Sequence, residues 1–230
     1  MIRSKKELKE YLTCERELYF GTGRSALLQG RLLGSKMFRI WQFLRTLRLA
    51  EYHKNAGGLR HRAAFAWYHR KKYVLGIRLG FEIPENCFEK GLMIYHIAPI
   101  VVNEDARIGR DCRITGNCCI GNTGADTPSP VLGDRVTLGW GCSVIGDVRI
   151  ADGVIVGAGC VVTKSVVQKE AHVAGVPGRV LPGKTARPET AARPETAGPD
   201  SAEEGRQEES GRQAAKERKQ SGRAQRQGRK

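Results

Sequence analysis

The sequence predicts a mainly β protein: a left-handed parallel β-helix of hexapeptide repeats, with an N-terminal helical region before it and a disordered basic C-terminal tail after it. Three observations carry this prediction. An aliphatic residue recurs at every sixth position in the middle of the chain, an apolar stripe at helical spacing precedes that region, and low-complexity sequence follows it. The predicted boundaries are a helical region over 1–75, a β-helix over 76–183 and a tail over 184–230.

The repeat runs from Val102 to Val162. Ten of the eleven residues at every sixth position in this range are Val, Ile or Leu, and the residue that follows is often small or turn-prone. A period of six fits neither an amphipathic helix nor a hairpin protein. It is typical of a three-sided solenoid, in which the aliphatic side chains point inward and neighbouring coils pair as parallel strands.

Four cysteines follow the same register: Cys112, Cys118, Cys142 and Cys160 are spaced by multiples of six. We therefore expect small buried side chains at one repeat position rather than a metal cluster, because no Cys-x-x-Cys pair is present. No metal is predicted. Seven cysteines and a polar, charged start from Met1 to Tyr11 favour a cytoplasmic protein with free thiols.

The 230 residues carry a net charge of +15, and residues 1–80 hold 18 Lys/Arg against 5 Asp/Glu. The apolar stripe over 33–47, with arginines between its members, has two interpretations. It can be a cap packed on the solenoid, which we favour, or a helix in peripheral contact with an anionic membrane at the inner face. No nucleic acid partner is predicted, because aromatic platforms and a known motif are missing. The tail, which repeats ARPETA, has too few apolar residues to fold.

The repeat is interrupted once, by the segment NTGADTPSP over 122–130. Its Gly, Asp, Thr, Ser and Pro residues are typical of a loop, and loops on a regular scaffold commonly carry function. We expect this loop to contact an acceptor substrate through Thr123, Asp126, Thr127 and Ser129.

Two further segments carry a resemblance to a known family. GLMIYHIAPIVVNE over 91–104 and VAGVPGRV over 173–180 resemble the bacterial hexapeptide-repeat acyltransferases, and more specifically the serine acetyltransferase branch, which includes polysaccharide O-acetyltransferases. The resemblance implies that His96 is the general base and that Glu82, in place of the family's Asp, orients it. An imidazole, with an ordinary pKa of about 6.5, suits removal of a hydroxyl proton at neutral pH. The alternative for His96 is a core position, because it lies six residues before Val102.

In this family, acetyl-CoA, the acyl donor, lies in a groove between adjacent subunits of a homotrimer. The resemblance implies that seven residues line this groove here: Gly121, Trp140, Ala158, Lys164, Gly175, Pro177 and Arg179. Lys164 and Arg179 would neutralise phosphates of CoA, and the small residues would let its pantetheine arm approach the backbone.

The loop departs from the serine acetyltransferases, which carry an Arg-His pair there. We therefore predict an O-acetyltransferase acting on a hydroxyl of a surface-polysaccharide sugar or its precursor. The alternative is a serine O-acetyltransferase of cysteine biosynthesis, and a second alternative is a non-catalytic β-helix scaffold. A zinc hydratase on the same fold would need three converging histidines, whereas the repeat region holds only His96 and His172.

Overall fold

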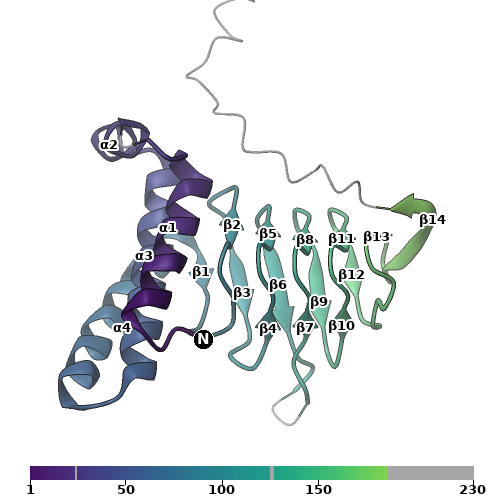
Figure 1. The fold of residues 1–230 in the computed structure, drawn as a ribbon. Coiled ribbons are helices and arrows are strands. Elements are labelled where there is room, and N and C mark those ends of the chain that lie inside the picture. Colours follow the sequence, from purple (N-terminus) through teal and green to yellow (C-terminus); the bar gives the residue numbers. More distant parts are fainter. Residues whose placement is uncertain (24, 125–126, 186–230) are drawn as a thin grey trace, which may run out of the picture. The chain divides into compact units, whose positions relative to one another are not determined.

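The computed structural model describes residues 1–23, 25–124 and 127–185, and within them four helices precede a stack of short strands (Figure 1). The helices are α1 (Lys5–Phe20), α2 (Ser25–Leu32), α3 (Lys36–Ala56) and α4 (Leu59–Leu79). The predicted tail lies outside the described residues except for 184–185, and so does Asp126 of the predicted acceptor loop.

The helices begin and end at residues that suit these roles. Ser4 caps α1 through its hydroxyl, which accepts a hydrogen bond from the Glu7 backbone N–H (3.1 Å), and the Glu7 carboxylate accepts one from the Ser4 N–H in return. Ser35 caps α3 through its hydroxyl, which accepts a hydrogen bond from the Phe38 N–H (3.2 Å). Gly57 and Gly58, both with positive φ, separate α3 from α4, so the two longest helices turn back on each other as a hairpin.

The strands form three sheets whose members are neighbouring coils of one solenoid (Figure 1). The first sheet contains β1 (Phe81–Glu82), β3 (Ile100–Val102), β6 (Cys118–Gly121), β9 (Ser143–Ile145) and β12 (Val161–Val162). The second contains β4 (Arg107–Ile108), β7 (Val131–Leu132) and β10 (Arg149–Ile150). The third contains β2 (Met93–Ile94), β5 (Arg113–Ile114), β8 (Thr137–Leu138), β11 (Ile155–Val156), β13 (Ala171–Ala174) and β14 (Arg179–Thr185). All pairings are parallel except β13 with β14, which confirms the predicted three-sided parallel solenoid.

The interior of the solenoid is the predicted aliphatic ladder. Ile114, Leu138 and Val156 of the third sheet are in register, and each is 2% exposed or less. The four cysteines of the repeat are also buried. Those at the start of β6 and just before β9 stack, with the Cys118 and Cys142 sulfur atoms 3.7 Å apart. Along β6 and β9, buried residues alternate with partly buried ones, as expected for strands with one face toward the core and one toward water.

The apolar stripe of α3 covers the open base of the solenoid. Ile40, Phe43, Leu44 and Leu47 are fully buried and belong to the same hydrophobic core as the strands. The Phe43 and Phe81 rings meet edge to face, with centroids 5.3 Å apart. The cap interpretation is therefore confirmed for these four residues, and their buried face is not available to a lipid surface. Leu33, the first residue of the predicted stripe, precedes α3 and is 74% exposed. None of the described helices has the length and apolar character needed to cross a bilayer.

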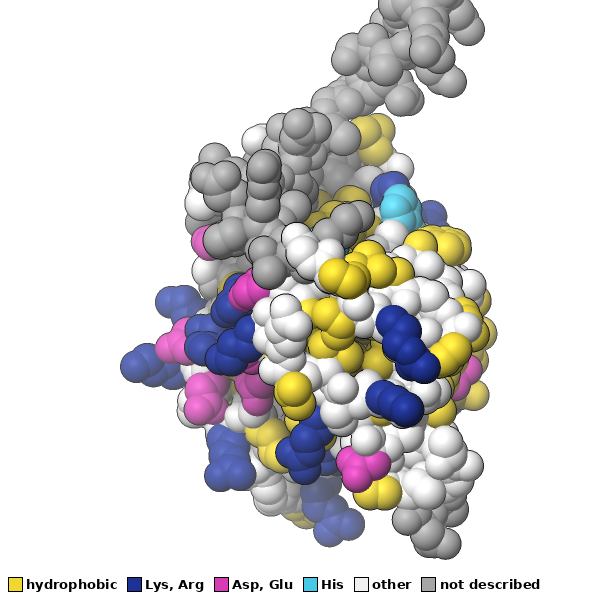
Figure 2. All heavy atoms as spheres, turned by 90° about the vertical axis from the view of Figure 1, so that its right-hand side faces the viewer, with side chains coloured by type: hydrophobic (Ala, Val, Ile, Leu, Met, Phe, Trp, Pro, Cys, Tyr) yellow, Lys and Arg dark blue, Asp and Glu magenta, His cyan; other side chains and the backbone are white. Residues whose placement is uncertain are grey.

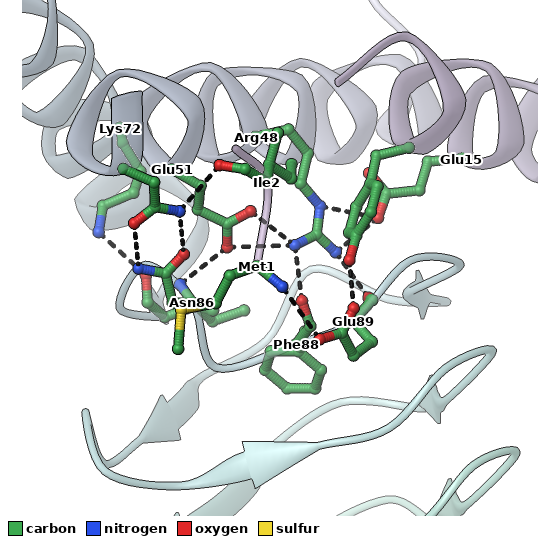
Figure 3. Close-up of polar contacts among 12 residues, drawn as sticks. Met1, Ile2, Glu15, Arg48, Glu51, Lys72, Asn86, Phe88 and Glu89 are labelled. Carbon is green, nitrogen blue, oxygen red and sulfur yellow. Dashed lines mark hydrogen bonds and ion pairs between the residues drawn. The ribbon is translucent and has the colours of Figure 1, made fainter. Parts of the chain in front are cut away.

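A buried ionic network fixes this cap to the first coil (Figure 3). The Arg48 guanidinium of α3 is fully buried and donates to the carboxylates of Glu15 (2.6 and 2.9 Å) and Glu51 (2.9 and 3.1 Å). It also donates to the main-chain carbonyls of Phe88 (2.8 Å) and Glu89 (3.0 Å), which lie in the first coil between β1 and β2. Burial alone would lower the pKa of Arg48, but the two carboxylates raise it above its ordinary value. One side chain therefore ties α1, α3 and the first coil together.

The other end of the solenoid is closed by the β13–β14 hairpin. Val173 pairs with Val180 across it. Val176 and Val180 of the hairpin are exposed, and so is Val167 in the turn before it. Figure 2 looks onto this end of the molecule and shows hydrophobic side chains between scattered lysines and arginines. A solenoid end needs such a closing element because its last coil has no neighbour to pair with.

Candidate active site

The candidate site lies at the corner where the chain passes from the third sheet to the first. In the third sheet the residues in register are Ile94, Ile114, Leu138, Val156 and Val173. Two positions after each of them stand, in the same order, His96, Gly116, Trp140, Ala158 and Gly175. Since consecutive coils are about 4.8 Å apart, these residues form a line up one corner. Four residues predicted for catalysis or cofactor binding thus come together on one line.

Gly116 lets two of these residues meet across the coil between them. A Cβ atom placed on Gly116 would lie 2.6 Å from the Trp140 ring, so only glycine leaves room for the indole to lie across this position. The Trp140 ring reaches the His96 imidazole edge to face, with centroids 5.9 Å apart. The sequence did not single out Gly116. The chain order gives no signal for it, because the register that places Gly116 between His96 and Trp140 comes from strand pairing between coils of different length.

The His96 side chain is exposed, and Trp140 is 45% exposed. His96 is not at an inward-facing strand position, because it lies in the corner from Tyr95 to Pro99 that connects β2 to β3. The core interpretation of this histidine is therefore wrong. An exposed imidazole with an aromatic wall on one side can meet a substrate hydroxyl.

Tyr19 of α1 supports the strand that leads to His96. The strand β2 is the edge of the third sheet, so one side of its backbone has no strand partner. The buried Tyr19 hydroxyl accepts a hydrogen bond from the Ile94 N–H (2.7 Å) and donates to the Ile94 carbonyl (3.2 Å). Burial raises the pKa of Tyr19, so the phenol stays protonated and can make both bonds. Sequence reasoning missed this residue, because nothing in the chain order relates residue 19 to residue 94.

Replacing Tyr19 by phenylalanine is expected to lower the free energy of unfolding by about 1–3 kcal/mol, since the Ile94 N–H and carbonyl lose their buried partner. Chemical denaturation would measure the loss, and hydrogen exchange would show faster exchange of the Ile94 amide. Tyr68→Phe on α4 is the matched control and is expected to change neither. An unchanged exchange rate at Ile94 in Tyr19→Phe would contradict the edge-support role.

Glu82, the predicted orienting residue, lies on β1 of the first sheet, in register with Val101. Its side chain is exposed. Within the described part of the chain, no hydrogen bond or ion pair joins Glu82 to His96. The structure therefore does not bring this predicted pair into contact, and the orienting role stays a prediction.

The predicted acceptor loop and part of the predicted cofactor set lie at the opposite end of the first sheet. Gly121 ends β6, the loop follows it, and Lys164 occupies the corresponding turn after β12. Strands of two to four residues, at about 3.3 Å per residue, separate this corner from the His96 corner. Arg179 and Pro177 belong to the closing end, and both are exposed. One chain alone therefore presents the predicted residues in separate groups.

Within the loop, the described hydroxyl groups bond to the protein itself. Ser129 is buried and donates to the Asn103 side-chain oxygen (2.8 Å). Thr127 donates to the Gly124 carbonyl (2.8 Å) and accepts from the Thr123 N–H (3.2 Å). These contacts shape the loop. Thr123 and Thr127 are exposed residues, whereas Ser129 is buried. Over residues 1–23, 25–124 and 127–185, no three His, Cys, Asp or Glu side chains converge as a metal site would require.

Comparison of this chain with known proteins finds relatives by sequence and by structure. No family model matches the chain. The serine acetyltransferase of Synechococcus elongatus is 35% identical over 105 residues, which cover 44% of this chain and 43% of that protein. The serine acetyltransferase of Bacillus pumilus is 31% identical over 132 residues, which cover 53% of this chain and 60% of that protein. The chain thus spans roughly half the length of these curated relatives.

Solved structures share the fold over a longer part of the chain. The serine acetyltransferase of Brucella abortus strain S19 superposes with a TM-score of 0.62 at 24% identity, over 79% of this chain and 71% of that one. A soybean serine acetyltransferase complexed with serine gives a TM-score of 0.62 at 22% identity, over 77% and 70%. A serine acetyltransferase in complex with CoA gives 0.57 at 20% identity, over 77% and 71%. The helical cap and the β-helix are therefore a fold seen in serine acetyltransferases.

Proposed function

We propose that this chain, whose β-helix is similar to that of the hexapeptide-repeat acetyltransferases, is an acetyl-CoA-dependent O-acetyltransferase with L-serine as acceptor. The observation that carries the proposal is the line of His96, Trp140, Ala158 and Gly175 along one solenoid corner. The relatives that match are named serine acetyltransferase, which favours the serine alternative over the surface-polysaccharide prediction.

The chemistry assigns His96 one task. Its imidazole takes the proton of the acceptor hydroxyl as the oxygen attacks the thioester carbonyl of acetyl-CoA. The carbon–oxygen bond forms, the carbon–sulfur bond breaks, and CoA leaves as a thiol after it receives a proton. The exposed position of His96 suits this role, because the acceptor hydroxyl must reach the imidazole nitrogen while its oxygen faces the thioester carbonyl. The carboxylate of Glu82 would orient the ring.

The line of residues along the His96 corner suits the extended pantetheine part of CoA. Ala158 and Gly175 leave open backbone above the exposed Trp140, where a pantetheine arm could lie against the strands. Two exposed cations could neutralise the phosphates: Arg179 at the closing end, and Lys164 at the far corner of the first sheet, which an adjacent copy would supply. Gly121 and Pro177 complete the proposed set.

A homotrimer would complete the site. The His96 corner and the Lys164 corner lie at opposite ends of the first sheet in one chain, so a groove holding both must combine two copies. The outer face of this sheet supports such packing, since Val101 is 42% exposed and the neighbouring Ile97 at the corner is 40% exposed. Two corners from adjacent copies would then form the groove. Contact with an anionic membrane remains a separate prediction that nothing at this site requires.

The acceptor is tested by release of CoA thiol from acetyl-CoA in the presence of L-serine. We expect saturable release that depends on the serine hydroxyl, with L-alanine as the matched control that lacks it. Parallel reactions contain simple sugars, nucleotide sugars and polysaccharide. The loop over 122–130 has no Arg, Lys or His in its sequence, so the serine carboxylate would have to be held by cations outside the loop. Saturable acetylation of a sugar, with L-serine inert, would contradict the serine proposal and restore the polysaccharide one.

A further inference from the structure

A groove without an assigned role lies between α1 and α3 on the helical cap. Its volume is about 280 Å³, which is near the lower limit for small-ligand sites. Leu8 and Leu12 of α1 and Trp41 of α3 form its apolar walls. None of its lining residues belongs to the candidate active site.

Four of the lining residues are cations, Lys5, Lys9, Arg16 and Arg45, and none is acidic. In the described part of the chain, no carboxylate pairs with Lys5, Lys9 or Arg45. Arg16 contacts only the carboxylate of its neighbour Glu17, at 3.4 Å. A concave surface lined by charges of one sign attracts an ion of the opposite sign.

Two hydrogen-bond donors on the lining residues lack an acceptor. Among the described residues, three buried side-chain nitrogen or oxygen atoms have no partner, and two of them are Arg16 Nε and Trp41 Nε1. The Trp41 ring is held by Phe20, edge to face at 5.8 Å, and by Phe38 at 6.0 Å. The Arg45 guanidinium lies 5.9 Å from the centroid of the same ring. Buried donors normally find acceptors. Because both nitrogen atoms are buried on residues that line the groove, a ligand acceptor would satisfy them after a shift of the Arg16 and Trp41 side chains toward it.

We propose that this groove binds a phosphate ester that carries an apolar or aromatic group. A phosphate brings close to two negative charges and three acceptor oxygens, which match several cations and two free N–H donors. A carboxylate would bring one charge to the same four cations. The Leu8, Leu12 and Trp41 side chains would contact the apolar group of the ester. This binding site is independent of the proposed acetyl transfer.

Titration calorimetry with 1-naphthyl phosphate tests the proposal on the full chain. We expect saturable binding with one site per chain, with inorganic phosphate binding more weakly and 1-naphthol not at all, because both the charge and the ring contribute. Absence of saturable binding by 1-naphthyl phosphate would overturn the proposal.

Variants locate the binding. Arg16→Gln is expected to weaken binding by about tenfold or more, the usual effect of losing a charge-assisted hydrogen bond. Trp41→Phe should weaken it several-fold through loss of the N–H. Arg45→Gln serves as a second charge variant, because this exposed residue can be replaced without disturbing the fold. Lys6→Gln makes the same charge change on an exposed α1 residue outside the groove, and equal weakening in this control would overturn the proposed site.

A lipid headgroup could supply the same chemistry, so a second arm uses phosphatidylcholine vesicles with and without phosphatidic acid. Competition between soluble 1-naphthyl phosphate and these vesicles, lost in Arg16→Gln and Arg45→Gln, supports the site with a lipid phosphate as one source. Saturable binding of the soluble ester without vesicle binding supports it with a soluble ligand. Vesicle binding that the Lys6→Gln control weakens equally would point to diffuse charge and overturn it.

Discussion

Replacement of His96 by alanine is expected to lower the turnover of acetyl-CoA by a factor of at least ~100, the usual scale for loss of a general base. The reason is that no other described histidine lies on the corner that carries the proposed cofactor line. Since the His96 side chain is exposed, the melting temperature should stay within the range of a surface substitution. Steady-state kinetics and thermal unfolding of the same preparation measure both quantities.

The matched control is His172→Ala, which removes a partly exposed imidazole from the outer face of the third sheet near the closing end. Its turnover should remain close to that of the parent protein. Glu82→Gln should have a smaller effect than His96→Ala, because an orienting carboxylate acts through the base. Turnover of His96→Ala near the parent level would exclude the proposed mechanism while leaving the fold assignment intact.

Replacement of Arg48 by alanine is expected to lower the free energy of unfolding by about 3–5 kcal/mol. The guanidinium is fully buried, and its loss leaves the carboxylates of Glu15 and Glu51 without their cation (Figure 3). Both carboxylates are themselves buried, so water cannot replace the lost bonds without opening the cap. Urea denaturation measures the change. Arg45→Ala, one turn earlier on the same helix and exposed, is the control and should change stability by no more than about 0.5 kcal/mol.

The pH dependence of the Arg48→Ala variant provides a second check. Burial raises the pKa of Glu15 even in the intact protein, and removal of Arg48 takes away the cation that opposes this shift. A carboxyl group with a raised folded-state pKa binds more protons in the folded state than in the unfolded state, so its contribution to stability grows as pH falls. The variant should therefore recover part of its lost stability on mild acidification. A loss below about 1 kcal/mol at neutral pH, or a deficit that deepens on mild acidification, would contradict a buried network that holds the cap.

The β-helix could be predicted because each side of the solenoid repeats the same short sequence pattern. An aliphatic residue at every sixth position has to point inward for the chain to bury it. These positions can be identified from the sequence alone. The same register placed Cys118 and Cys142 inside, where they stack. The apolar stripe over 33–47 could be predicted for a similar reason, because helical spacing puts apolar side chains on one face, and its residues Ile40, Phe43, Leu44 and Leu47 are the ones the structure buries.

The register between neighbouring coils could not be predicted from this pattern, because the coils differ in length. The third-sheet register advances from Ile94 to Ile114, then to Leu138, Val156 and Val173, that is by 20, 24, 18 and 17 residues. A constant period of eighteen would not have aligned His96 with Gly116 and Trp140. Hydrogen bonding between neighbouring strands sets this alignment, and turns of different length absorb the extra residues.

The sequence by itself therefore determines which residues enter the core and which type of solenoid they build, since both follow from a repeat among residues that are close together in the chain. Tertiary contacts decide where the chemistry lies. The support of the His96 strand by Tyr19 rests on the contact of Tyr19 with Ile94, 75 positions away, and the Arg48 network rests in part on the contact of Arg48 with Glu15, 33 positions away. Local spacing carries no information on such pairs, because they form only when α1 packs on α3 and on the first coil.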